Sequence, residues 1–206
     1  MSLDENQPRA SGAVALRIAI VPGVTPGKWT RRWQERHPDI PCEIVRIDDA
    51  NGRAVLDSGR ATASFLRLPV DRDGLSVIRL YSEVPVLVVS RDSILSSRES
   101  LTSAEIAELP GVVSYPPEGS VKDAVALVAA GVGALALPHS VARLHARKDV
   151  VAIPVTDSTE TEVAICWLAD ETTNVIEEFV GIVRGRTAAS SRSVVPPVKR
   201  GKRRGR

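Results

Sequence analysis

Short apolar runs alternate with helix-forming segments along most of the chain, and this alternation constrains the fold more than any other feature. Residues 16–21 form a β-branched run typical of a strand buried on both faces. A helix is predicted next, with Thr25 as a suitable N-cap and Pro26 as a suitable first residue. A strand at 41–47, a short helix and a strand at 61–68 follow. Because strands separated by helices usually pair in parallel, the pattern predicts an α/β fold.

A second series of elements continues the pattern to the end of the apolar part of the chain. Further strands are predicted at 75–80, 84–90, 111–115, 133–137, 149–155 and 161–168. The strongest local signal is a capping box of Thr102 and Glu105, enclosed by a hydrophobic staple of Leu101 and Ile106. A last helix at about 172–184 has its acids early and its arginines late, as the helix dipole favours. The sequence therefore contains two loosely similar α/β units.

Composition indicates a globular protein that can form two small lobes. The 206 residues are 43% hydrophobic and 25% charged. No apolar run reaches the ~18 residues of a membrane span, and the acidic, polar N-terminus does not resemble a secretory signal. Cys42 and Cys166, both in apolar strand-like runs, are predicted to be reduced, buried thiols. We expect a cytoplasmic protein that does not contact the membrane.

The net charge of +2 conceals an asymmetry along the chain. Residues 187–206 contain seven basic and no acidic residues, which leaves 20 basic against 25 acidic residues in the rest. This segment has too little apolar surface to fold and is predicted to be disordered. It either makes a weak, salt-sensitive contact with nucleic acid or an acidic partner, or has no specific partner. The candidate contact residues are Lys199, Arg200, Lys202, Arg203, Arg204 and Arg206.

Four segments, in order, resemble the effector-binding domain of LysR-type transcriptional regulators. Residues 16–20 are similar to the opening strand of that family, and residues 33–40 resemble its F-x-x-x-Y-P-x-V segment. Residues 56–63 resemble L-x-x-G-x-x-D-x, with Thr62 where the family usually has Asp. Residues 128–138 resemble V-x-x-G-x-G-x-x-x-L-P, the most specific of the four. The resemblance implies the fold of type II periplasmic binding proteins.

That fold consists of two Rossmann-like lobes joined by two crossing segments, with the ligand between the lobes. The chain is expected to leave the first lobe near 84–90 and to return through 161–168. The expected parts are a disordered head at 1–13, a first lobe at 14–85 and 163–186, a second lobe at 86–162 and a disordered basic tail at 187–206. Only about 15 residues precede the opening strand, so we expect no helix-turn-helix. The second lobe is expected to be shortened.

The carboxyl ends of the strands carry the residues expected to bind an effector. Ligands of open α/β sheets bind at these ends, and helices that open there favour an anion. The candidate effector-binding residues are Val24, Thr25, Arg67, Ser90, Ser114, His139 and Ser140. Arg67 can pair with a carboxylate, which predicts a small carboxylate-bearing effector. The alternatives are that Thr25 and Ser140 only cap helices, that Arg67 is a surface charge, and that His139 is an ordinary loop residue.

No motif for catalysis, a metal or a cofactor is present in the sequence. His37, His139 and His145 lack partners at metal-ligand spacing, and no C-x-x-C, G-x-S-x-G or P-loop motif occurs. Trp29 and Trp33, four residues apart, are interpreted as core residues rather than a base-stacking platform. We therefore expect no enzyme. The leading hypothesis is a stand-alone effector-binding module in transcriptional regulation, acting as a homodimer or as a mixed dimer with a full-length regulator. The alternatives are a nucleic-acid-associated protein acting through its tail and a ligand-free dimerisation scaffold.

Overall fold

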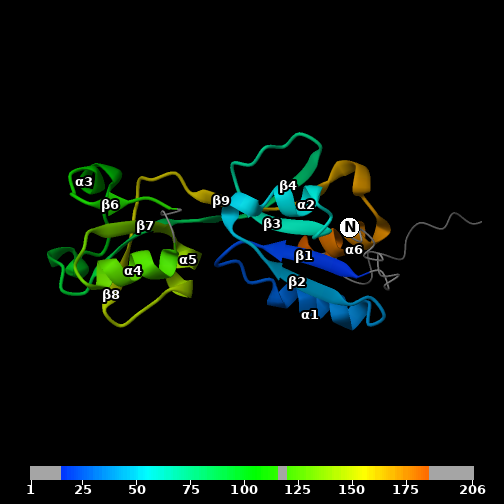
Figure 1. Ribbon diagram of the computed structural model, residues 1–206, viewed down its shortest axis with the longest axis horizontal. Coiled ribbons are helices and arrows are strands. Elements are labelled where there is room, and N and C mark those ends of the chain that lie inside the picture. The colour runs from blue at the N-terminus through cyan, green and yellow to red at the C-terminus, as the bar shows by residue number, and fades with distance from the viewer. Residues whose placement is uncertain (1–14, 116–119, 186–206) are drawn as a thin grey trace, which may run out of the picture.

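A computed structural model describes residues 15–115 and 120–185, and two β-sheets lie end to end along its long axis (Figure 1). Lobe I comprises β1 (Leu16–Ile20), α1 (Gly27–Arg36), β2 (Cys42–Arg46), α2 (Ala54–Asp57), β3 (Ala63–Arg67), β4 (Leu75–Glu83), β9 (Thr161–Leu168) and α6 (Asn174–Val183). Lobe II comprises β5 (Pro85–Ser90), α3 (Ser103–Ala107), β6 (Val112–Val113), α4 (Val121–Ala129), β7 (Ala134–Pro138), α5 (His139–Leu144) and β8 (Val150–Pro154). Short 3-10 turns are η1 (Asp49–Asn51), η2 (Ile94–Ser97) and η3 (Ala169–Glu171).

The sheet of lobe I has the strand order β2-β1-β3-β9-β4 and is only partly parallel. Strand β1 pairs in parallel with β2 and β3, as the alternation of strands and helices predicts. Strand β9 is antiparallel to both β3 and β4, and the pairing with β4 shifts register between Arg79 and Tyr81. Because of this long pairing, β4 continues to Glu83 instead of ending at residue 80.

The chain passes between the lobes twice. The first crossing is at Val84, between β4 and β5, and the second is the segment 155–160, between β8 and β9. The predicted crossing segments, 84–90 and 161–168, are in fact mainly strands that belong to one sheet each. The crossings are therefore shorter than predicted. They lie next to each other, because the Val155 amide donates to the Pro85 carbonyl at 3.0 Å.

Aromatic side chains form the centre of the lobe I core. The Trp29 and Phe65 rings are stacked with centroids 4.9 Å apart, while Phe179 of α6 meets Trp33 edge-on at 5.9 Å. Trp33 is fully buried, and its indole N–H donates to the Ile40 carbonyl at 2.9 Å. The interpretation of both tryptophans as core residues is confirmed.

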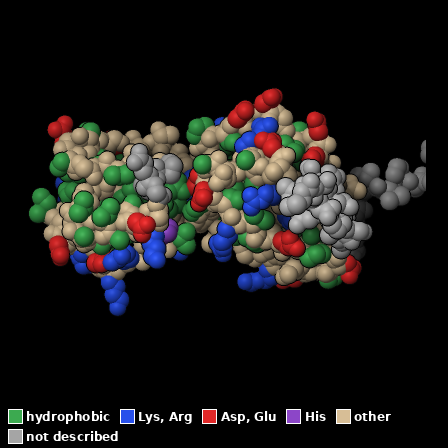
Figure 2. Space-filling view, in the orientation of Figure 1, with side chains coloured by type: hydrophobic (Ala, Val, Ile, Leu, Met, Phe, Trp, Pro, Cys, Tyr) green, Lys and Arg blue, Asp and Glu red, His purple; other side chains and the backbone are tan. Residues whose placement is uncertain are grey.

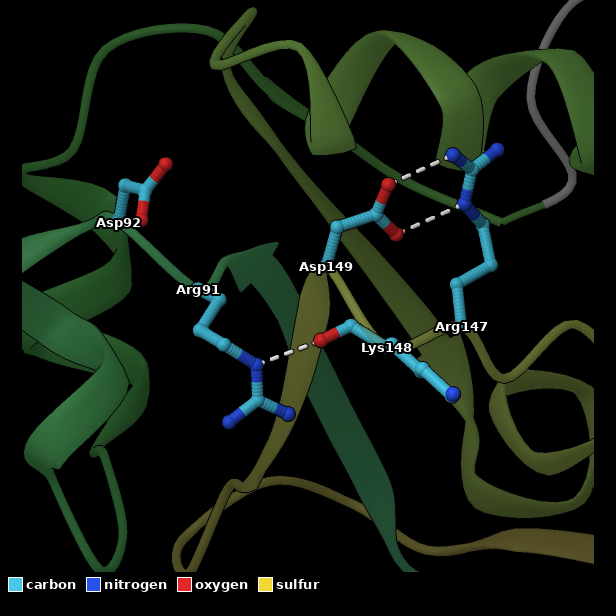
Figure 3. Close-up of a pocket in the computed structure, with 5 residues that line it drawn as sticks. All are labelled: Arg91, Asp92, Arg147, Lys148 and Asp149. Atoms are coloured by element: carbon cyan, nitrogen blue, oxygen red, sulfur yellow. Dashed lines mark hydrogen bonds and ion pairs between the residues drawn. The ribbon is translucent and has the colours of Figure 1, made fainter.

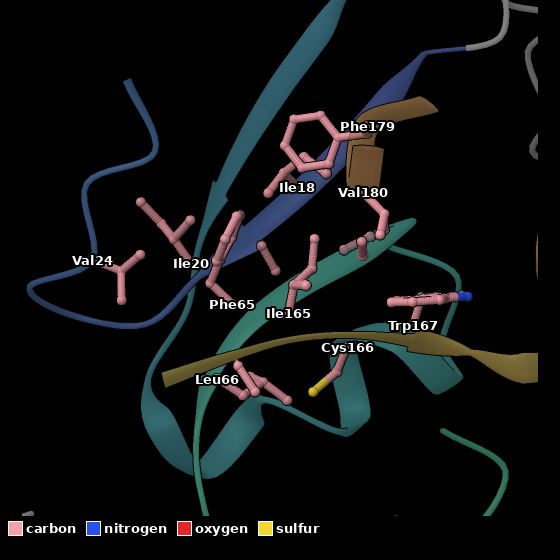
Figure 4. Close-up of a cluster of buried hydrophobic side chains, with 14 of the residues drawn as sticks. Ile18, Ile20, Val24, Phe65, Leu66, Ile165, Cys166, Trp167, Phe179 and Val180 are labelled. Carbon is pink, nitrogen blue, oxygen red and sulfur yellow. The ribbon is translucent and has the colours of Figure 1, made fainter. Parts of the chain in front are cut away.

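Strands β3 and β9 are buried on both faces. Phe65 and Ile165 pair across the two strands on one side, whereas Leu66 and Cys166 lie on the other side (Figure 4). Helices α1 and α6 cover the first side and α2 covers the second. This double cover explains why these strands are almost continuously apolar.

Strand β5 gives lobe II two small cores, one on each face of its sheet. Val86 and Val88 pack with α4 and α5, whereas Leu87 and Val89 face the side of α3. The predicted capping box at Thr102 and Glu105 is present at the start of α3. The helix predicted after the first strand is present as α1, but its predicted start is wrong. That helix begins at Gly27, after Pro26 in the N-cap position, and the exposed Thr25 side chain caps nothing.

Candidate functional site

The two lobes meet where the parallel strands of lobe I end. Strands β1, β2 and β3 finish at the same edge of their sheet, at Ile20, Arg46 and Arg67. Lobe II presents to this edge the segments after β6 and β7, which contain Tyr115 and Ser140. The space-filling view shows a narrow waist at this seam (Figure 2).

A buried arginine joins the two lobes at the seam. The Arg67 side chain is only 6% exposed. Its Nε donates to Glu83 at 2.9 Å and its Nη1 to Asp49 at 3.0 Å. Its Nη2 donates to the Pro22 carbonyl at 2.7 Å and to the Ser140 hydroxyl at 3.0 Å. Only Ser140 belongs to lobe II, so this one bond connects the guanidinium to α5.

Tyr115 adds a second bond between the lobes. Its hydroxyl donates to Asp49, and its ring centroid lies 5.7 Å from the Arg67 guanidinium carbon. Burial and the hydrogen bond to Asp49 raise the pKa of Tyr115, so the phenol stays a donor. Burial opposes the charge of Arg67, but Glu83 and Asp49 together raise its pKa. We call Pro22, Asp49, Arg67, Glu83, Tyr115 and Ser140 the Arg67 cluster.

Gly23 allows the loop after β1 to approach α5 closely. Its φ is +84°, and a Cβ at this position would lie 2.4 Å from the Ser140 hydroxyl and 2.8 Å from the Ser140 carbonyl carbon. A side chain is therefore excluded both by backbone conformation and by space. Nearby, the His139 amide donates to the carbonyl of Val84 at the first crossing, at 3.2 Å.

A hollow of about 240 Å³ lies beside the Arg67 cluster and is lined by both lobes. Its lining residues are Ile20, Val21, Pro22, Arg46, Ile47, Asp48 and, from lobe II, Leu144. Arg46 is exposed and forms no ion pair within the described part of the chain. The hollow is smaller than the ~300–1,000 Å³ typical of drug-sized ligands, which suits a small metabolite.

The structure brings together most of the predicted effector-binding residues, with different degrees of access. Arg67 and Ser140 are bonded to each other, and Arg67 is not a surface charge. Val24 is 4% exposed and belongs to the lobe I core, whereas Thr25, Ser114 and His139 are exposed around the seam. Neither Thr25 nor Ser140 serves as a helix cap.

Ser90 is not brought to the seam. Strand β5 starts at the first crossing and runs away from lobe I, so its last residue lies at the far end of lobe II. The Ser90 hydroxyl there accepts a hydrogen bond from the Asp92 amide at 3.3 Å. The six basic residues predicted to contact nucleic acid, from Lys199 to Arg206, lie outside the described residues.

A second hollow, of about 540 Å³, lies near Ser90 at this far end (Figure 3). Its charged lining comprises Arg91, Asp92, Arg147, Lys148 and Asp149. Arg147 and Asp149 form a two-bond ion pair at 2.8 and 2.7 Å. Arg91 donates through Nε to the Lys148 carbonyl at 2.6 Å. These bonds pair much of the charge internally, and every lining side chain is exposed.

Sequence reasoning missed several members of the seam. Asp49 and Glu83 lie just after the expected strands at 41–47 and 75–80, and Tyr115 is the last residue of the expected strand at 111–115. Nothing in the local sequence marks them, since each acquires its role from a partner far away in the chain. Gly23 is the exception, because a glycine in the loop after the first strand is a general signal for close backbone approach.

Residues 15–115 and 120–185 contain no group of three or more His, Cys, Asp or Glu side chains that could hold a metal ion. None of the described helices is long and apolar enough to cross a membrane. Cys42 and Cys166 are free thiols; Cys166 is buried and Cys42 only partly so. Burial raises the pKa of each to about 11, which keeps both protonated at neutral pH.

Comparisons with known proteins agree with this architecture. The family model for the LysR substrate binding domain matches residues 11–125. The HTH-type transcriptional regulator BudR of Raoultella terrigena is 22% identical over 198 residues, which cover 79% of this chain and 68% of that protein.

Two solved structures share the fold. The BenM effector binding domain with its effector benzoate has a TM-score of 0.71 at 18% identity and covers 89% of this chain and 97% of its own. The reduced form of the OxyR regulatory domain from Pseudomonas aeruginosa has a TM-score of 0.66 at 19% identity, with 90% and 99% covered.

Proposed function

Because the chain belongs to the LysR substrate-binding domain family, we propose that it binds a small effector at the seam between its lobes and takes part in regulating transcription. The observation that carries this proposal is the Arg67 cluster, in which one buried guanidinium bonds to both lobes. The adjoining hollow, also lined by both lobes, supplies the space. A ligand that contacts both lobes can shift the equilibrium between two relative positions of the lobes. The shift is as large as the difference in its affinity for the two positions.

The chemistry of the seam favours a carboxylate as the polar group of the effector. The forked guanidinium of Arg67 matches a carboxylate, and the Ser140 hydroxyl, which accepts a hydrogen bond from Arg67, has its own O–H to donate. Arg46 adds an available positive charge at the hollow, next to the apolar side chains of Ile20 and Leu144. The BenM domain, which has the same fold, holds the carboxylate benzoate. An apolar body with one carboxylate would fit this combination.

Calorimetric titration with a panel of small carboxylates, benzoate among them, tests the proposal, with the corresponding neutral amides as ligand controls. We expect saturable binding of a carboxylate and not of its amide. Arg67→Ala should weaken that binding by about 1.5–3 kcal/mol, the value of a charged hydrogen bond. Arg46→Gln should weaken it less, because Arg46 remains exposed to solvent.

Arg60→Gln is the matched control, because Arg60 is an exposed lobe I arginine at the opposite edge of the sheet, before β3 begins. Equal affinity in wild type and Arg67→Ala would remove Arg67 from the site. If no carboxylate binds, a ligand-free dimerisation scaffold becomes the better interpretation.

A contact between the basic C-terminal segment and nucleic acid is a second proposed function. It is supported by seven basic residues and no acid from position 187 onward, next to an otherwise acidic chain. Phosphate contacts of this kind are salt-sensitive and carry no base readout. Removing residues 199–206 should abolish binding to duplex DNA at low salt. Binding that survives this removal would contradict the proposal.

We also propose that the chain pairs with a second copy or with a full-length regulator. Strand β2 is an outer strand of the lobe I sheet, and Ile44 on it is 38% exposed. Unpaired strand edges and exposed apolar side chains are typical of surfaces that become covered by association. Light scattering after size-exclusion chromatography measures the mass directly, and a monomer at all concentrations would contradict homodimer formation.

A further inference from the structure

The two carboxylates that hold Arg67 are not equivalent. Glu83 ends β4 at the first crossing, and its side chain is only 5% exposed. Asp49 opens the short turn η1, and its side chain is 18% exposed. Glu83 is thus the more deeply buried partner, whereas Asp49 is on a short surface element and is more accessible to solvent.

Asp49 accepts hydrogen bonds from donors of both lobes. Its Oδ1 accepts from Arg67 Nη1 at 3.0 Å, within lobe I. Its Oδ2 accepts from the Tyr115 hydroxyl, which belongs to lobe II. A carboxylate ligand between the lobes would use the same donors. Asp49 therefore occupies the position of such a ligand with a carboxylate of the chain itself.

We propose that Asp49 is an internal competitor of the effector: the effector's carboxylate replaces that of Asp49 on Arg67 and Tyr115. This inference rests on the proposed function at the seam and identifies the residue that sets its affinity. Arg67 stays paired during the exchange. The exchange therefore avoids the large free-energy cost of leaving a buried charge without a partner. The hollow beside the cluster is lined by Asp48, which precedes Asp49 in the chain, and by Pro22, whose carbonyl accepts from Arg67.

Replacing Asp49 by asparagine tests the competition. Asp49→Asn removes the competing charge but keeps the size of the side chain and an acceptor for Tyr115. With benzoate as the probe in calorimetric titration, we expect Asp49→Asn to bind about tenfold or more tightly than wild type, because the cost of displacing a charged hydrogen bond disappears. Benzamide, which lacks the charge, should show no such gain.

Asp39→Asn is the matched control. Asp39 is an exposed lobe I aspartate in the turn before β2, at the sheet edge opposite the seam. It changes the net charge by the same amount, so it separates a general electrostatic effect from competition at Arg67. Benzoate affinity should be the same in Asp39→Asn and wild type. An equal gain in both variants would overturn the proposal.

A readout without ligand distinguishes a failure of the inference from a failure of the proposed function. In hydrogen–deuterium exchange, Asp49→Asn should speed exchange of the His139 amide at the crossing, because the bond between Asp49 and Tyr115 is weakened. The amides of β1 should be unaffected. Benzoate bound with equal affinity by wild type and Asp49→Asn overturns the competition while the proposed function stands.

If neither protein binds benzoate or another carboxylate of the panel, the proposed function is contradicted and with it the competition. Faster exchange in Asp49→Asn would then show only that Asp49 bridges the lobes. Unchanged exchange together with unchanged affinity would show that Asp49 neither bridges nor competes. Tighter benzoate binding with faster exchange is the result that supports the inference.

Discussion

At the scale of one residue, the close contact between the lobes at Ser140 requires that Gly23 has no side chain. We predict that Gly23→Ala lowers the free energy of unfolding by about 3 kcal/mol, since a positive φ and a clash with the backbone of Ser140 act together. Chemical denaturation measures this loss directly. The variant should also weaken any ligand that needs the lobes in contact.

Gly131→Ala is the matched control for this prediction. Its φ of +83° is almost the same as that of Gly23, but nothing lies within 4 Å of the added Cβ. It should lose only the ~1–2 kcal/mol of left-handed backbone strain. Equal losses in the two variants would show that the contact with Ser140 adds nothing to the stability of the fold.

The chain contains enough local information to predict Arg67 and Ser140 at the seam and too little to predict Asp49, Glu83 and Tyr115. Arg67 was predicted because it stands at the end of a recognisable strand, where ligands of such sheets bind. Its bond to Ser140 joins residues 73 positions apart, and that from Tyr115 to Asp49 spans 66. Such pairs depend on how the lobes are placed, which no local pattern encodes.

At the scale of elements, the short helix α3 has a complete capping box in its first turn. The Thr102 hydroxyl accepts from the Glu105 amide, and the Glu105 carboxylate accepts from the Thr102 amide at 2.8 Å. We predict that Thr102→Ala lowers the free energy of unfolding of lobe II by about 1 kcal/mol. Thermal denaturation tests this. Thr62→Ala removes a threonine outside any helix cap in lobe I and should leave lobe II unchanged.

The same cap predicts a pH dependence. Hydrogen bonds from the Thr102 amide, from Arg98 and from the Thr102 hydroxyl lower the pKa of Glu105 to about 2. A depressed carboxyl pKa stabilises the fold above the ordinary value of ~4.3, and this stabilisation is lost as the pH falls toward 2. Wild type should therefore be more stable than Glu105→Gln at pH 6, and the difference should vanish near pH 2. A constant difference would contradict the assignment.

Element boundaries were predictable where a signal lies within one segment. The capping box of α3 and the strand β9 occur where the sequence predicts them, because hydroxyl–carboxylate spacing and an apolar run are local properties. The direction of β5 relative to the seam was not predictable, which is why Ser90 was grouped with residues from the other end of the lobe. The direction in which a strand runs within its sheet is decided by where the chain crosses between the lobes, not by the sequence of the strand itself.

At the scale of the whole molecule, each lobe has a hydrophobic core of its own. We predict that Phe179→Ala destabilises lobe I by about 3–5 kcal/mol while leaving hydrogen exchange in β7 almost unchanged. Leu135→Ala should do the converse, with a loss of about 2–5 kcal/mol confined to lobe II. Exchange that increases everywhere in either variant would show that the lobes unfold as one unit.

The family resemblance and the two-lobed α/β fold are confirmed by the family model and by the solved structures that share the fold. They were predictable because they depend on the order of strands and short motifs along the chain. Whether Arg67 at the seam is free or paired within the chain was not predictable, since its neighbours in the sequence are the same in both cases. Only the placement of Asp49 and Glu83 distinguishes them.

The position of β9 between β3 and β4 has a consequence for synthesis on the ribosome. Lobe II is encoded by one uninterrupted stretch, Pro85 to Pro154, and all its strands are available once that stretch has emerged. The sheet of lobe I stays incomplete until Thr161–Leu168 is translated, although its first strand leaves the exit tunnel long before. The half of the molecule made first is therefore the half that finishes folding last.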